Sequence, residues 1–361
     1  MSGTASFARS AGPGSGPDGA PSAIALSPIL SARYRSRDLE RIRAAAPGAR
    51  IVSVSVEGLA DGPVEDVEVM LRGWLSSDAF DRILARAPRL TWVHSATSGV
   101  ERALTRSALE RGVVVTNARG VFSRPIAEYV VMMILAVSRR LPQLLELQRE
   151  RTWQPLEGTE LRDVTVGIVG LGSIGRAVGA LATAFGCRVV AVRRRADAGN
   201  DLRAETGGSV ADSGHAPGEV MLDRVGGPES LPELLAESDF IVLAAPLTAE
   251  TEDMINDETL ALVKPGAWLI NVARGRLIDA RALLRALRDG PLGGAVLDTF
   301  RDEPLPPMSS FYDLPNVIVT PHTAWSSGRV LDRSVELFCD NLRRFAAGEP
   351  LLNVVDPAAG Y

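Results

Sequence analysis

Lysine is almost absent from the 361-residue chain, and histidine and cysteine are scarce. Lys264 is the single lysine, so all but one of the 39 basic residues are arginines, and 44 acidic residues outweigh them to give a net charge of −5. A nucleic-acid partner needs a basic face that neutralises its phosphates, and this charge balance argues against one. The two cysteines, Cys187 and Cys339, lack metal-ligand spacing, so we expect no metal site and a reducing, cytoplasmic environment.

Long apolar runs are also missing, which argues against a membrane protein. The longest run, residues 130–137, is too short to span a bilayer. The first residues are rich in Gly, Pro, Ser and Ala and lack the basic-then-apolar order of a signal peptide, so we expect a disordered tail over residues 1–21. The rest of the chain is long enough for about two domains.

Short apolar runs alternate with helical patterns along the rest of the chain, which indicates βαβ units and parallel sheets. One series precedes residue 126 and a second begins at Val164, and the Gly-rich, polar residues 196–228 are expected to be a loop insertion. Strands are predicted at residues 23–26, 50–56, 66–71, 90–94 and 113–116, and then at 187–192, 240–244, 267–271, 294–298 and 317–320. Helices are predicted at residues 36–46, 78–87, 126–149 and 328–346, and Gly348 is suited to cap the last one.

The second series opens with a glycine-rich turn between a predicted strand and a predicted helix. Gly170, Gly172 and Gly175 have G-x-G-x-x-G spacing, with Ser173 and Ile174 between the last two. In a dinucleotide-binding turn the first glycine permits a tight reversal, the second lets a pyrophosphate approach the backbone, and the third lets helix pack on strand. The free N–H groups of the helix N-terminus then face the phosphates. This order of elements predicts a dinucleotide site.

The strand after this turn ends in arginines, where NAD-binding folds usually place an acid that accepts from the ribose 2′-OH. Arg193 lies 193 − 175 = 18 residues after Gly175, and Arg194 follows it. A carboxylate would repel a 2′-phosphate, whereas a guanidinium pairs with one. The arginines therefore favour NADP(H) over NAD(H), although a solvated basic turn would have the same sequence.

Three histidines are candidates for acid–base chemistry. His215 falls in the polar insertion, where solvation is the simpler explanation, and His94 ends a predicted strand. His322 follows another strand at its carboxyl end, where ligands of parallel sheets bind. Arg274 and Glu303 follow neighbouring strands. Carbonyl reduction needs a cation beside the carbonyl, a proton donor and an anion that keeps the donor protonated, and these three residue types supply those roles.

In these segments the chain resembles the D-isomer-specific 2-hydroxyacid dehydrogenases, the family of phosphoglycerate dehydrogenase and glyoxylate/hydroxypyruvate reductase. The resemblance covers residues 90–361 and is weak before them. The matching segments are 92–100 (WVHSATSGV), 116–120 (TNARG), 126–129 (IAEY), 170–175 (GLGSIG), 245–248 (APLT), 271–275 (NVARG), 297–304 (LDTFRDEP) and 320–322 (TPH).

The resemblance implies hydride transfer between NAD(P)H and the C2 carbon of a small 2-oxo or 2-hydroxy acid. It implies Arg274 as the substrate-binding arginine, His322 as the acid–base and Glu303 as its partner. It further implies that backbone N–H groups near Ser98, Gly99 and Val100 hold the substrate carboxylate. The remaining residues that it places at the cofactor are Pro246, Thr251, Val272, Ala273 and Asp298.

The resemblance also implies two doubly wound, Rossmann-like α/β domains with a cleft between them. A substrate domain would comprise residues 22–126 and 324–361, interrupted by a dinucleotide-binding domain over residues 127–323. Relatives usually form homodimers through the cofactor domain, and the apolar segment 130–137 is consistent with that.

Two departures from the family pattern leave open questions. His94 stands where many relatives have Gln, so it is either a second imidazole near the substrate or a buried residue. Trp325 either walls the pocket or packs between domains.

Two rival functions remain open. A phosphite-type dehydrogenase and a nucleotide-sensing corepressor scaffold both keep a similar triad, whereas formate dehydrogenases lack the acid partner that Glu303 supplies. The absence of a partner-binding tail beyond the short N-terminal one favours the enzyme.

Overall fold

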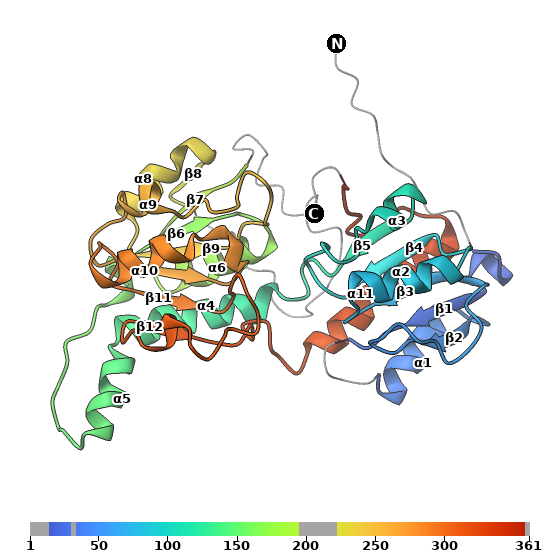
Figure 1. The fold of residues 1–361 in the computed structure, drawn as a ribbon, viewed down its shortest axis with the longest axis horizontal. Coiled ribbons are helices and arrows are strands. Elements are labelled where there is room, and N and C mark those ends of the chain that lie inside the picture. Colours follow the sequence, from blue (N-terminus) through green and yellow to red (C-terminus); the bar gives the residue numbers. More distant parts are fainter. Residues whose placement is uncertain (1–13, 30–33, 195–221, 358–361) are drawn as a thin grey trace, which may run out of the picture. The chain divides into compact units, whose positions relative to one another are not determined.

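The computed structural model describes residues 14–29, 34–194 and 222–357. These residues form two compact α/β units, one of residues 14–121 and 328–357 and the other of residues 122–194 and 222–327. The second unit is therefore inserted in the sequence of the first (Figure 1). His215 and residues 196–221 of the expected insertion lie outside the described residues.

The described part of the first unit holds a five-stranded parallel sheet in the order β2-β1-β3-β4-β5 (Figure 1). Its strands are β1 (Ala23–Leu26), β2 (Arg50–Ser53), β3 (Val67–Arg72), β4 (Trp92–Ser95) and β5 (Val114–Asn117). Its helices are α1 (Ser36–Ala45), α2 (Ser77–Arg86), α3 (Arg106–Glu110) and α11 (Val330–Ala347). Gly348 caps α11 with a left-handed φ of 66°, which confirms the C-cap prediction.

Both faces of this sheet are covered, as its apolar strands require. Successive side chains of a strand point to opposite faces. In β1, Ala23 and Ala25 belong to the core formed with α2 and α3, whereas Ile24 and Leu26 belong to the core formed with α1 and α11.

The second unit has, within its described residues, a seven-stranded parallel sheet in the order β12-β11-β10-β9-β6-β7-β8. Its strands are β6 (Thr165–Val169), β7 (Arg188–Val192), β8 (Arg224–Gly226), β9 (Phe240–Leu243), β10 (Trp268–Asn271), β11 (Gly294–Leu297) and β12 (Val317–Val319). Its helices are α4 (Ser123–Ser138), α5 (Leu141–Arg149), α6 (Ser173–Ala184), α8 (Leu231–Glu237), α9 (Asp257–Leu260) and α10 (Ala280–Arg288). The strand order reverses between β6 and β9, and ligands of doubly wound sheets bind at the carboxyl ends of strands beside such a reversal.

Three predictions from the sequence need correction. The helix expected over residues 126–149 is broken into α4 and α5 because Arg140 adopts a left-handed φ of 58°. Residues 224–226, expected within the loop insertion, form β8, a short edge strand that pairs with β7. Residues 14–21, expected in the disordered tail, are folded, because the backbone amide of Ser15 donates to the buried carboxylate of Glu68 at 3.1 Å.

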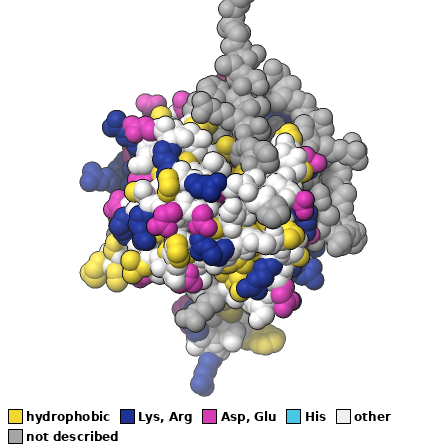
Figure 2. Space-filling view, turned by 90° about the vertical axis from the view of Figure 1, so that its right-hand side faces the viewer, with side chains coloured by type: hydrophobic (Ala, Val, Ile, Leu, Met, Phe, Trp, Pro, Cys, Tyr) yellow, Lys and Arg dark blue, Asp and Glu magenta, His cyan; other side chains and the backbone are white. Residues whose placement is uncertain are grey.

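The charged surface matches the balanced composition. On the face drawn in Figure 2, basic and acidic side chains are interspersed rather than segregated. Ion pairs such as Arg37–Asp332 (2.9 Å) and Arg106–Glu110 (2.6 Å) place opposite charges side by side. Within the described part of the chain, no helix combines the length and the apolar character that crossing a membrane requires.

His94 is fully buried in the core of the first unit. Its Nδ1 lies 2.7 Å from the hydroxyl oxygen of Thr116. The same oxygen accepts a hydrogen bond from the indole N–H of Trp92 at 2.9 Å. Its ring packs on Phe338 with the centroids 5.7 Å apart. Desolvation lowers the pKa of His94 from 6.5 to about 3, so the imidazole is neutral in the folded unit and belongs to its core.

The burial of His94 predicts an acid-sensitive fold. Between pH 6.5 and about 3 the unfolded chain binds a proton at this residue and the folded chain does not, so the free energy of unfolding falls as the pH is lowered. We expect His94→Gln to remove this dependence, so that between pH 7 and pH 5 the wild type loses about 2 kcal/mol more than the variant. Chemical denaturation followed by tryptophan fluorescence at both pH values measures it. Parallel losses in the two proteins would contradict the prediction.

Candidate active site

The glycine turn after β6 leaves room for a phosphate group. Gly170 has a φ of +102°, and a β-carbon there would lie 2.4 Å from the amide nitrogen of Ala245. A β-carbon on Gly175 would lie 2.1 Å from the carbonyl oxygen of Gly170. At Gly172, by contrast, a β-carbon would meet no atom within 4 Å. Gly170 and Gly175 are therefore required by the fold, whereas the open space at Gly172 fits close approach of a ligand to the backbone.

Helix α6 starts at this turn, with Gly172 as its N-cap and Ser173 and Ile174 in its first turn. The first N–H groups of a helix have no partner within it and carry its positive dipole end. The residues present therefore fit the pyrophosphate of a dinucleotide, which Gly172, Ser173 and Ile174 would hold through backbone N–H groups.

Arg193 and Arg194 directly follow β7, next to β6 in the sheet. The backbone amide of Arg193 donates to the carbonyl of Gly226 at 3.0 Å, which fixes the end of β7 against β8. The exposed Arg194 is close enough to the turn after β9 for its charge to affect a carboxylate there. There the pKa of Glu250 is lowered by the hydroxyl of Thr248, by its own backbone amide and by the charge of Arg194.

That turn after β9 is held together by Thr251. Its hydroxyl donates to the carbonyl of Pro246 at 2.8 Å and accepts from the backbone amide of Thr248 at 2.8 Å. Pro246 itself is exposed. The ring of Pro246 is thus presented on a turn whose shape the Thr251 side chain sets.

Arg274 is carried by a turn that Asn271 shapes at the end of β10. The buried Asn271 side chain donates to the carbonyl of Arg274 at 2.9 Å and accepts from the amide of Ala273 at 3.0 Å. Ala273 and the preceding Val272 are buried. Sequence reasoning placed Asn271 in a motif but gave it no role. An Asx-type turn after a strand was the available signal.

His322 and Glu303 lie in direct contact. The Nδ1 atom of His322 lies 2.8 Å from Oε2 of Glu303, and the other carboxylate oxygen accepts from the backbone amide of Phe300 at 2.9 Å. Burial alone would raise the pKa of Glu303. The hydrogen bonds from His322 and Phe300 and the charges of His322 and Arg274 outweigh it, so the pKa lies below its usual value. Arg274, Glu303 and His322 thus form one electrostatic cluster, in which Glu303 contacts the Nδ1 atom of His322 and not its Nε2 atom.

The loops that carry this cluster pack closely backbone to backbone. A β-carbon on Gly275 would lie 1.9 Å from the carbonyl carbon of Phe300. Only glycine allows this approach, and it brings the segment of Arg274 against the segment that leads to Glu303. Among the described residues, no group of three or more His, Cys, Asp or Glu residues could hold a metal ion.

Asp298, which the resemblance places near the nicotinamide, and Trp325, whose role the sequence left open, both contact the segment of His322. The buried carboxylate of Asp298 accepts from the hydroxyl of Thr320 at 2.6 Å and from the amides of Thr323 and Ala324 at 2.8 and 3.0 Å. The indole N–H of Trp325 donates to the carbonyl of His322 at 2.7 Å. Sequence reasoning missed the contribution of Thr320.

In the first unit, the loop after β4 presents three consecutive backbone amides. The carbonyl of Ser98 accepts from the Asn117 side chain at 3.0 Å, and that of Gly99 accepts from the Thr97 hydroxyl at 2.7 Å. Over the described chain, the amides of Ser98, Gly99 and Val100 donate to no other residue. Carbonyls turned inward and N–H groups left available are the features of an anion-binding loop.

Comparison with known proteins decides the family. The family model described as "D-isomer specific 2-hydroxyacid dehydrogenase, NAD binding domain" matches residues 131–213 and 210–324. The chain belongs to the D-isomer-specific 2-hydroxyacid dehydrogenases. This dehydrogenase is 33% identical over 303 residues to a glyoxylate reductase of Korarchaeum cryptofilum, a match that covers 81% of this chain and 84% of the relative.

Solved structures agree with this family. The D-isomer-specific 2-hydroxyacid dehydrogenase of Xanthobacter autotrophicus Py2, in complex with NADPH and MES, is 31% identical with a TM-score of 0.79, over 95% of this chain and 100% of the other. The NADPH-dependent glyoxylate/hydroxypyruvate reductase of Sinorhizobium meliloti, in complex with NADP and sulfate, is 27% identical with a TM-score of 0.73, over 94% and 100%. The present dehydrogenase is thus an NAD(P)-dependent oxidoreductase built of two parallel-sheet α/β domains.

Proposed function

We propose that this dehydrogenase is an NADPH-dependent reductase of small 2-oxo acids of the glyoxylate and hydroxypyruvate type. The observation that carries the proposal is the contact between His322 and Glu303 (2.8 Å), next to which the charge of Arg274 helps to lower the pKa of Glu303. The names of the relatives, glyoxylate reductase and glyoxylate/hydroxypyruvate reductase, support this substrate class.

The roles follow from what each group can donate. His322 donates the Nδ1 proton to the Glu303 carboxylate, which fixes the orientation of the ring, so Nε2–H is the acid that protonates the C2 oxygen. Arg274 stabilises the negative charge that develops on that oxygen. The amides of Ser98, Gly99 and Val100 bind the acid's carboxylate. The nicotinamide, when bound, supplies the hydride.

His322→Ala tests this assignment. We expect kcat for glyoxylate or hydroxypyruvate reduction to fall about 100-fold or more, since general acids contribute that much. NADPH oxidation followed at 340 nm across glyoxylate, hydroxypyruvate, pyruvate and phenylpyruvate measures this loss. Near-normal turnover in the variant would refute the mechanism. Nucleotide binding without turnover of any acid would favour the corepressor-type function.

Arg193 and Arg194 support a preference for NADPH, and Arg193→Glu tests it. A charge-assisted hydrogen bond to the 2′-phosphate predicts a fall in kcat/KM for NADPH of about 10- to 100-fold, with NADH little affected. The matched control is Arg106→Glu, which makes the same charge change on the exposed α3 of the first unit. A wild-type enzyme that prefers NADH would sink this part of the proposal.

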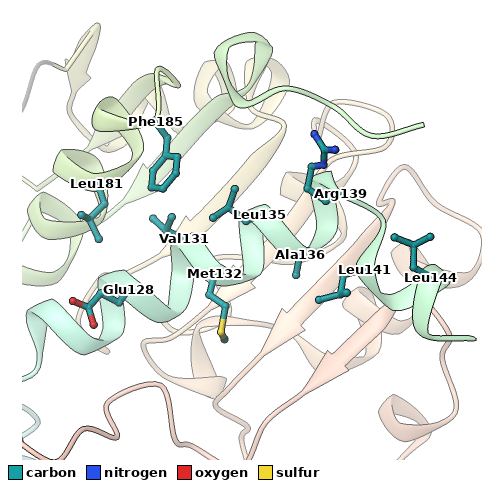
Figure 3. Close-up of a pocket in the computed structure, with 10 residues that line it drawn as sticks. All are labelled: Glu128, Val131, Met132, Leu135, Ala136, Arg139, Leu141, Leu144, Leu181 and Phe185. Atoms are coloured by element: carbon teal, nitrogen blue, oxygen red, sulfur yellow. The ribbon is translucent and has the colours of Figure 1, made fainter. Parts of the chain in front are cut away.

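We also propose a homodimer formed through the second unit. Helices α4, α5 and α6 line an apolar groove (Figure 3). Met132, Leu141 and Phe185 are 45–51% exposed there, and contiguous apolar surface of this kind marks association sites. We expect twice the chain mass by light scattering, reduced to a monomer by Met132→Glu. Met308, which is 93% exposed elsewhere in this unit, gives the control Met308→Glu, whose mass should not change. A wild type that is monomeric would refute the proposal.

A further inference from the structure

The backbone of His322 is strained. Its φ of +50° lies in the left-handed region, which the β-carbon of a non-glycine residue disfavours. Such conformations persist only where surrounding contacts fix them. The contact between Nδ1 and Glu303 orients the ring, but it does not hold the backbone, so other contacts must do so.

The Asp298 carboxylate accepts hydrogen bonds from the chain on both sides of His322. Before the histidine, the hydroxyl of Thr320 donates to Oδ1 at 2.6 Å. After it, the amides of Thr323 and Ala324 donate to Oδ1 at 2.8 Å and to Oδ2 at 3.0 Å. Asp298 is 1% exposed, so water does not compete for these bonds.

The bond to Thr320 is extended by a tyrosine. The hydroxyl oxygens of Tyr129 and Thr320 lie 2.6 Å apart. Because Thr320 gives its single proton to Asp298, its oxygen must accept from Tyr129. Burial, opposed by this hydrogen bond and aided by the charge of Asp298, raises the pKa of Tyr129 to about 12, so the phenol remains a donor at any working pH. Tyr129 thus donates a hydrogen bond to Thr320, and Thr320 donates one to Asp298. We call this chain of two hydrogen bonds the relay.

We propose that Tyr129, Thr320 and Asp298 are positioning residues that fix the left-handed backbone of His322 and thereby aim its ring. This role rests on the proposed function of His322 as the acid. The resemblance places Asp298 near the nicotinamide, and gripping the histidine segment is a second task for the same carboxylate. Glu303 sets the direction of the ring, while this relay sets the position of the residue that bears it.

Thr320→Val removes the central hydroxyl with little change in shape. Since one hydrogen bond to a charged group is lost, we expect kcat to fall about 10-fold, with the KM for the acid and the Kd for NADPH within about twofold of wild type. Thr320→Ser keeps the hydroxyl and should restore kcat. The matched control is Thr299→Val, because the Thr299 hydroxyl is also buried but forms no hydrogen bond with any described residue. Its kcat should stay that of wild type.

Two double-variant cycles separate positioning from general structural damage. Tyr129→Phe acts only through Thr320, so we expect a loss of about threefold alone and none when added to Thr320→Val. In a His322→Ala background, Thr320→Val should not lower the residual activity further, because there is no imidazole left to aim. Tyr129→Phe also keeps the proposal testable if Thr320→Val does not fold.

The failures are distinguishable. If His322→Ala abolishes turnover while Thr320→Val and Tyr129→Phe match wild type, the relay is refuted and the proposed function stands. The relay is likewise refuted if the loss appears in the Kd for NADPH, or if Thr320→Val costs as much without His322 as with it. If His322→Ala is fully active, the proposed function itself fails, and the relay fails with it.

Discussion

The parallel sheet of the second unit is the constraint on which its candidate site depends. Because β6, β9, β10, β11 and β12 all run in one direction, their carboxyl ends share one edge, and every candidate residue of this unit except those after β7 and in α4 follows one of them. The order of the strands can therefore bring together residues that are far apart in the sequence. It brings Arg274, Glu303 and His322 into one electrostatic cluster although 48 residues (322 − 274) separate the first from the last.

Close backbone packing is the second constraint, and it separates the glycines that the fold requires from a glycine that it does not. Gly175 is pressed against the carbonyl of Gly170, and Gly275 against Phe300, so a side chain at either would push strands and helices apart. Gly172 has empty space before it. The same spacing pattern therefore contains two kinds of glycine, and only coordinates tell them apart.

The sequence predicted the two α/β units, most strands and the His322–Glu303 pair, because apolar periodicity and polar residues at strand ends are local signals. It missed what depends on a few contacts. The break at Arg140 arises from one left-handed residue in an otherwise apolar helical pattern. The folding of residues 14–21 depends on the distant Glu68. Asp298 and Thr320 were both in matching segments, yet no pattern reveals that the hydroxyl of one donates to the carboxylate of the other.

Two carboxylates beside one histidine do different tasks because their surroundings differ. Asp298 is almost fully buried, and a buried carboxylate is tolerable only when it is well hydrogen-bonded. The two amides and the hydroxyl that satisfy it all belong to the segment around His322. The hydrogen bonds that make its burial tolerable are therefore the same ones that hold that segment in place. Glu303 keeps 37% of its side chain exposed, and one of its oxygens faces the imidazole. The carboxylate that contacts the imidazole is thus the one left within reach of water. The carboxylate that holds the backbone segment is the one that is buried.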